Sequence, residues 1–186
     1  MKTKHIRQIL LLLSMAALTP ATYSKEVVAE KTPVVEKETL QKGSLTSMIH
    51  DSVTFSTLSK ALAAAELDMT LGNKGEFTIF APTDDAFGKL PAAVLAKLLL
   101  PENKEKLRSL LLYHVVAGKV LAAELKDGEV KTMNGEKITV AISRDTIKIN
   151  SEKVFSADIA ANNGVMHSIG TVLIPKSLEG FAGLSK

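Results

Sequence analysis

Apolar residues follow two different spacings along this chain of 186 residues, and the change from one to the other divides the chain. Up to about residue 113 they recur every three or four positions, as at Phe55, Leu58 and Leu62, which is the period of an amphipathic helix. Beyond residue 127 short runs of β-branched residues alternate with turn residues, which indicates strands. Helices that come mostly first and strands that come mostly last favour an α+β fold with a largely antiparallel or mixed sheet.

Local start and stop signals place the expected elements. Ser44 can cap a short first helix, and the helices expected after it cover about 55–65, 92–100 and 102–113. The strands expected after residue 127 cover 130–133, 137–142, 147–150, 154–159, 165–169 and 172–174. Asn134-Gly135, between the first two of these strands, predicts a hairpin because both residues accept the positive φ angles of a tight turn.

The densest local signal is the segment 77–87, Phe-Thr-Ile-Phe-Ala-Pro-Thr-Asp-Asp-Ala-Phe. Its first residues favour a strand, which must stop at Pro82 because proline cannot donate to a ladder. Thr83 supplies a hydroxyl that can cap a helix, and the two following carboxylates favour the positive end of that helix. The segment therefore predicts an internal strand, a sharp corner and a helix that is capped by Thr83 or Asp84 and buries Phe87.

This segment resembles the first signature motif of the fasciclin, or FAS1, domain family. Tyr113-His114 resembles the central Tyr-His motif of the family, and the segment 163–175, Asn-Gly-Val-Met-His-Ser-Ile-Gly-Thr-Val-Leu-Ile-Pro, resembles its second signature. The three motifs occur in the family's order within residues 44–178, and three ordered motifs are more specific than any one of them. The resemblance implies the FAS1 fold, a twisted β-sandwich or wedge flanked by several short helices.

The ends of the chain differ in composition from its centre. Residues 1–24 have the basic start, apolar run and small residues of a secretory signal peptide. An uncleaved membrane anchor is the alternative, although the run is shorter than the roughly 20 apolar residues that a span needs. Residues 25–43 predict a flexible charged spacer, 44–178 the FAS1 domain and 179–186 a C-terminal tail. We therefore expect a secreted or periplasmic single-domain protein.

Charge and composition exclude several classes of partner and site. Three of the 23 basic residues, Lys2, Lys4 and Arg7, lie in the expected leader, which leaves 20 basic against 20 acidic residues. A neutral mature chain argues against nucleic acid as the partner. The chain has no cysteine, which excludes a disulfide framework and cysteine-based metal sites.

Residue types that carry catalysis or bind metals are present without their usual spacings. His50, His114 and His167 remain after the leader, and none stands in a short metal-binding spacing. Ser168 lacks the Gly-x-Ser-x-Gly context of a nucleophile elbow. Asp84 and the aspartate after it would point about 100° apart on a helix, so capping is expected rather than acid/base chemistry. We expect no enzyme, cofactor or metal site, and we expect His167 to be a core histidine.

Two sets of residues are candidates for partner binding. The Asp158-Ile159 pair is similar to the integrin-binding segment of animal matrix members of the family, and the Tyr113-His114 motif carries adhesive activity in animal relatives. In each case the alternative is structural, with Asp158 bonding a turn and the other three side chains packed in the core.

Two positions in the second signature depart from the family's pattern. Ser168 stands where the family usually has an apolar residue, and Gly170 stands where it usually has Asp or Asn. Gly170 removes a side chain that could bond a turn, so any partner contact that relatives make through that position is in doubt here.

These features together predict a non-enzymatic, secreted adhesion module that binds protein or carbohydrate at a cell surface or in extracellular matrix. The alternative is a periplasmic or extracellular protein that binds a small apolar ligand such as haem, with histidines and methionines lining a groove. Methionines are more simply explained as core fillers.

Overall fold

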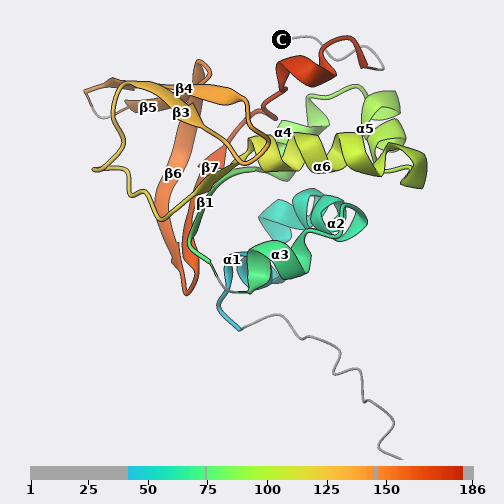
Figure 1. Cartoon of the computed structure of the whole chain (residues 1–186), viewed down its shortest axis with the longest axis horizontal. Coiled ribbons are helices and arrows are strands. Elements are labelled where there is room, and N and C mark those ends of the chain that lie inside the picture. Colours follow the sequence, from blue (N-terminus) through green and yellow to red (C-terminus); the bar gives the residue numbers. More distant parts are fainter. Residues whose placement is uncertain (1–41, 74, 145, 182–186) are drawn as a thin grey trace, which may run out of the picture. The chain divides into compact units, whose positions relative to one another are not determined.

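The computed structural model describes residues 42–73, 75–144 and 146–181 (Figure 1). The expected signal peptide at 1–24 and all but the last two residues of the expected spacer at 25–43 lie outside the described residues. Within the three described ranges, no helix has both the length and the apolar character needed to cross a membrane.

Seven strands of the described chain form a sheet in the spatial order β2-β1-β7-β6-β5-β4-β3. β1 runs parallel to β7, and every other pair of neighbours is antiparallel. The sheet is therefore mixed, as predicted. The strands are β1 Phe77–Pro82, β2 Val115–Ala117, β3 Gly128–Lys131, β4 Lys137–Ser143, β5 Thr146–Ile149, β6 Glu152–Ala161 and β7 Gly164–Ile169.

The helices gather on one side of β1 and β7, and strands β3 to β5 lie on the other side (Figure 1). They are α1 Leu45–Asp51, α2 Ser56–Ala64, α3 Asp68–Gly72, α4 Asp84–Gly88, α5 Ala92–Leu98 and α6 Lys104–Tyr113, with 3₁₀ turns η1 Val53–Phe55, η2 Pro101–Asn103 and η3 Lys176–Leu178. The sequence did not indicate α3, because it is a five-residue helix without a capping side chain.

β1 and β7 separate two apolar clusters. Ile79 and Met166 belong to the cluster that packs against the helices, whereas Phe80 and Ile169 belong to the cluster on the side of β3 to β5. Neighbouring side chains on a strand point to opposite faces, so each of these strands supplies both clusters. This double coverage explains why all six residues of β7 are buried.

The structure confirms the predicted strand, corner and helix at 77–87. β1 lies between β2 and β7 and ends at Pro82. The Thr83 side chain caps α4, since its Oγ1 accepts a hydrogen bond from the N–H of Ala86 at 3.3 Å. Phe87 is buried against the helical cluster.

The predicted hairpin also forms, between β3 and β4. Gly135 has a φ of +95°, and Oδ1 of Asn134 accepts a hydrogen bond from the N–H of Glu136 at 2.8 Å. The turn therefore uses the glycine for its backbone angle and the asparagine for its side chain.

The predicted strand at 172–174 is wrong. Val172 and Leu173 are buried, but the N–H of Leu173 donates to Nε2 of His114 at 2.9 Å instead of to a neighbouring strand. The apolar run that suggested a strand is core-filling coil.

Candidate functional site

The Tyr113-His114 motif lies at the end of α6 and is buried, with 3% and 2% of the two residues exposed. The Tyr113 hydroxyl donates to the carbonyl oxygen of Lys137 at 3.1 Å and accepts from Nδ2 of Asn150 at 2.9 Å. One phenol therefore joins α6 to β4 and to the turn after β5.

His114 makes the second half of this connection. Nδ1 of its ring donates to the carbonyl oxygen of Leu110 at 2.8 Å, and Nε2 accepts from the N–H of Leu173. Burial lowers the pKa of His114 to about 4, although the bond to Leu110 opposes the shift. His114 is therefore a neutral internal link at physiological pH.

Both side chains of the motif are used inside the domain, which fits the structural alternative. Contact between Tyr113 or His114 and a partner stays a prediction, and it would require the domain to open at the end of α6.

His167, in the centre of β7, is fully buried and stacks on Phe80 with 5.5 Å between the ring centroids. Its Nε2 donates to the carbonyl oxygen of Val120 at 3.0 Å, and its Nδ1 accepts from the N–H of Asp158 at 3.2 Å. Burial lowers its pKa, against the opposing effects of the Val120 bond and the Asp158 charge. His167 thus attaches β6 and the segment 118–127 to β7.

The Asp158-Ile159 pair divides between surface and interior. Asp158 is exposed, has a φ of +57°, and accepts a hydrogen bond on Oδ1 from the N–H of Ala122 at 2.7 Å. Aspartate tolerates this left-handed conformation better than most residues. Ile159 is partly buried against the helical cluster. The carboxylate of Asp158 is therefore the part of the pair that faces solvent.

The two departures from the family's second signature both contact β6. Ser168 accepts a hydrogen bond on Oγ from the N–H of Ser156 at 3.0 Å, at a point where the pairing of β6 with β7 shifts register. Phe155 lies over Gly170, where an added Cβ would come within 2.2 Å of the Phe155 ring. Phe155 is nevertheless 64% exposed. Ser168 and Gly170 therefore both shape an exposed stretch of β6.

Asp84 has a longer-range role than the sequence indicated. Its two carboxylate oxygens accept hydrogen bonds from the N–H groups of Ser56 and Thr57 and from the Ser56 hydroxyl, at 2.6–3.3 Å. Partial burial opposes ionisation, but these bonds outweigh it and lower the pKa of Asp84. Asp84 therefore caps the start of α2, while Thr83 caps α4.

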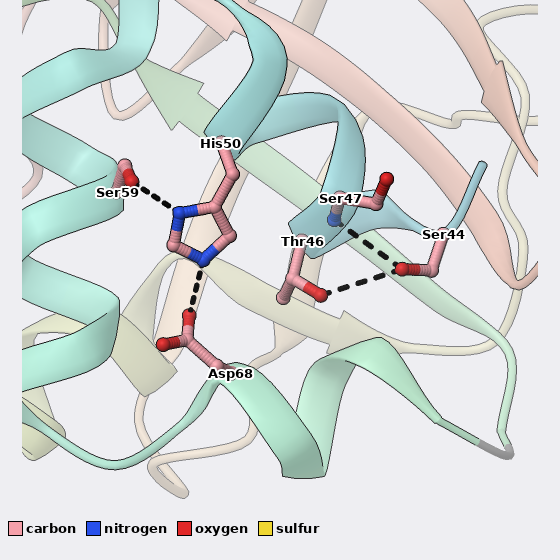
Figure 2. A network of polar contacts seen from close by, with 6 residues as sticks. All are labelled: Ser44, Thr46, Ser47, His50, Ser59 and Asp68. Atoms are coloured by element: carbon pink, nitrogen blue, oxygen red, sulfur yellow. Dashed lines mark hydrogen bonds and ion pairs between the residues drawn. The ribbon is translucent and has the colours of Figure 1, made fainter. Parts of the chain in front are cut away.

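A Ser-His-Asp contact that the sequence did not indicate joins the first three α-helices (Figure 2). His50 of α1 lies with Nδ1 2.5 Å from Oγ of Ser59 in α2, and with Nε2 3.0 Å from Oδ1 of Asp68 in α3. Figure 2 also shows the cap of α1, where Oγ of Ser44 accepts from the N–H of Ser47. No spacing rule relates these residues, because helix packing alone brings them together.

The same three residue types serve as nucleophile, base and orienting acid in hydrolases. Ser59, however, lies inside α2, where the backbone N–H groups bond along the helix and do not form an oxyanion hole beside its hydroxyl. The contact is best explained as a link among the three helices.

The described residues do not support a haem or metal site at the histidines. Both ring nitrogens of His114 and of His167 bond to protein groups. Among all the residues that the structure describes, there is also no group of three or more His, Asp or Glu side chains placed to hold a metal ion.

Comparison with known proteins identifies the family to which the chain is similar. A family model for the fasciclin domain matches residues 53–175. Protein sll1483 of Synechocystis sp. is 50% identical over 122 residues, which cover 66% of this chain and 68% of that protein. Cell surface glycolipoprotein MPB83 of Mycobacterium bovis is 36% identical over 146 residues, which cover 72% of this chain and 64% of that protein.

Animal proteins match over a smaller part of their length. The transforming growth factor-beta-induced protein ig-h3 of Sus scrofa is 37% identical over 138 residues, which cover 72% of this chain but only 19% of that protein. A solved FAS1 domain pair from the insect cell adhesion molecule fasciclin I has a TM-score of 0.63 at 20% identity, covering 72% of this chain and 51% of the pair. This structural match shows the fold alone. Since the family model covers well over half of the residues, the chain belongs to the fasciclin domain family.

Proposed function

We propose that this protein is an exported binding module that attaches to a protein or carbohydrate partner at a cell surface or in a matrix, and that it does so without catalysis. The name of one relative supports this role, since it is a cell surface glycolipoprotein. The place of Ser59 inside α2, where backbone N–H groups bond along the helix, supports binding over hydrolysis.

The recognition surface that we propose is the exposed part of β6 around Phe155 and Asp158. This observation carries the proposal: most residues of the signature motifs are buried, whereas β6 keeps a large aromatic side chain and a carboxylate exposed a few residues apart. An aromatic side chain that loses its exposed area on binding commonly dominates the energy of an interface. The carboxylate adds orientation and specificity.

The experiment is binding of the purified chain to cells, to matrix extracts and to a polysaccharide array. Phe155→Ala should weaken binding at least about tenfold, which is a moderate hot-spot effect. Val53→Ala is the control, because Val53 is 90% exposed and lies on a different element, η1. Equal losses in the two variants, or no binding by the unaltered chain, would refute the proposed surface.

Asp158 can be tested separately because asparagine retains an oxygen that can accept the bond from Ala122. Asp158→Asn therefore removes the charge while keeping the turn. We expect about threefold to tenfold weaker binding, and no change in Asp51→Asn, which alters an exposed carboxylate on α1.

Export can be tested by recovering the protein from the periplasm or medium. Its mass should correspond to a chain that begins near residue 25.

A further inference from the structure

An open cavity of about 240 Å³ lies on the side of the sheet away from the helices, and Thr78 and Phe80 of the first signature contribute to its lining. Phe80 of β1, Val116 of β2 and Leu125 form its apolar interior, and all three belong to the cluster on the side of β3 to β5. Val120 and Val130 complete the apolar lining.

The wall formed by the segment 118–127 is held in place by hydrogen bonds on both sides. Oγ1 of Thr78 accepts from the N–H of Val120 at 2.9 Å and donates to the carbonyl oxygen of Gly118 at 2.7 Å. The carbonyl oxygen of Val120 accepts a hydrogen bond from Nε2 of His167. These bonds satisfy the polar groups beside the cavity, so its interior offers apolar surface to a ligand.

The charged residues of the lining are mostly acidic. They comprise three carboxylates and one amine, from Glu124, Asp127, Glu129 and Lys126. Glu129 forms an exposed ion pair with Lys137, at 2.7 Å. Glu129 is offset by Lys137 and also feels the charge of Lys176, whereas Glu124 and Asp127 stand against Lys126 alone within the lining. These two carboxylates favour a cation over an anion at their end of the mouth.

We propose that this cavity binds a small amphiphile that has an apolar ring or short chain and a cationic amine. An apolar cavity of about 150 Å³ is known to hold benzene, so this volume can hold a molecule of about ten non-hydrogen atoms. The apolar part contacts Phe80, Val116 and Leu125, and the amine lies among the carboxylates at the mouth. The site is independent of the proposed surface on β6, and either can fail without the other.

The test compares three compounds that share one ring and chain: 4-phenylbutylamine, 4-phenylbutanol and 4-phenylbutyrate. Titrated into the full chain at low salt and followed by amide chemical shifts, the amine should bind saturably and shift residues 120–130. It should bind at least about fivefold more tightly than the carboxylate, and this ratio should fall as salt screens the carboxylates. No saturable binding of the amine, or equal affinity for the amine and the carboxylate, would overturn the proposal.

Two variants locate the site. Val130→Phe fills the cavity from a partly exposed position and should weaken amine binding about tenfold, whereas Val53→Phe, the same change on a remote exposed turn, should have no effect. Unchanged affinity in a folded Val130→Phe variant would overturn the proposal.

The second variant tests the charge without altering the apolar interior. Glu124→Gln combined with Glu129→Gln leaves Asp127 against Lys126 and Lys137, so the amine-to-carboxylate ratio should fall to one or below while the alcohol binds as before. Glu102→Gln, at an exposed position on η2, is its control. A ratio that the double variant leaves unchanged would assign the selectivity to other groups and overturn the proposed site, even if Val130→Phe fails to fold.

Discussion

β6 and β7 are neighbours in the same sheet, but they serve different purposes. β7 has all six residues buried and pairs with β1 in an unbroken parallel register. β6 has ten residues, of which only Val154 is buried, and its pairing with β7 shifts register twice. The family's second signature therefore includes all six residues of the strand that builds the core, while the proposed recognition surface lies on the irregular strand beside it.

β6 and β7 differ because apolar clusters cover both faces of β7, whereas most of β6 is exposed. A strand between two apolar clusters has little tolerance for change, because each side chain meets a packed neighbour. A strand with one exposed face can accept bulges and unusual backbone angles, and those features direct side chains outward. The motifs that identify the family therefore contribute mainly to the packed core, and the binding surface that we propose lies beside them.

The largest expected effect comes from Gly164, the first residue of β7. It has a φ of +153°, and a Cβ there would lie 1.9 Å from the carbonyl oxygen of Phe77. Gly164→Ala should therefore cost about 3 kcal/mol or more of unfolding free energy, measured by urea denaturation. Gly88→Ala is the matched control, because an added Cβ at Gly88 meets no atom within 4 Å and should change stability by less than about 1 kcal/mol. Similar stabilities for the two variants would contradict the conclusion that the packing of β7 leaves no room for a side chain at Gly164.

The second-largest effect that we expect is a loss of unfolding free energy in acid, caused by the buried histidines. The folded-state pKa of His114 is about 4, below its ordinary value of 6.5, so the unfolded chain binds more protons between these values. Stability is then full above pH 6.5 and falls as the pH drops toward 4, by up to about 3 kcal/mol for this one group. His167 acts in the same direction because its pKa is also lowered.

The measurement is the free energy of unfolding between pH 7.5 and 4 for the unaltered chain and for His114→Gln. The variant loses stability at pH 7 because it disturbs a buried pair of hydrogen bonds, but it should show a shallower decline on acidification. Parallel declines would mean that His114 is not a neutral buried group.

A smaller effect is expected for Ser168→Ala. The change removes the oxygen that accepts from the N–H of Ser156 at the register shift. The expected loss is about 1 kcal/mol, typical of one hydrogen bond. Faster hydrogen exchange of the Ser156 amide would show that the bond is responsible, and an unchanged exchange rate would show that it is not.

The smallest change in stability is expected for Gly170→Asp, which introduces a residue that the family usually has at this position. The new Cβ would displace the Phe155 ring, which is largely exposed and free to move outward. Stability should change by less than about 1 kcal/mol, since an exposed side chain can relocate. Partner binding should nevertheless fall as it does in Phe155→Ala. Unchanged partner binding by Gly170→Asp would show that the position of the Phe155 ring does not matter for recognition.

Several features of the fold could be predicted because they depend on neighbours in the sequence. The strand that ends at Pro82, the cap at Thr83 and the hairpin at Gly135 all follow from backbone angles and hydrogen bonds within a few residues. The α+β class followed from the order of the periodicities, and the buried state of Phe87 from its place on an apolar face.

The features that could not be predicted depend on segments far apart in the chain. The apolar residues at 172–174 resemble a strand, but a ring nitrogen of His114 takes the hydrogen bond that a strand would need. Asp84 carries the local signal of a cap for α4, yet it caps α2 from 27 residues away. The Ser59-His50-Asp68 contact has no signal in the sequence at all.

The sequence by itself determined the family, the fold class and the corner at 77–87, because short-range sterics and hydrogen bonding specify them. Only the tertiary structure decided that Tyr113 and His114 are internal links, that Phe155 stays exposed over Gly170, and that a cavity remains beside Phe80. Exposure and empty volume arise from how all the elements pack together, so no local pattern of residues specifies them.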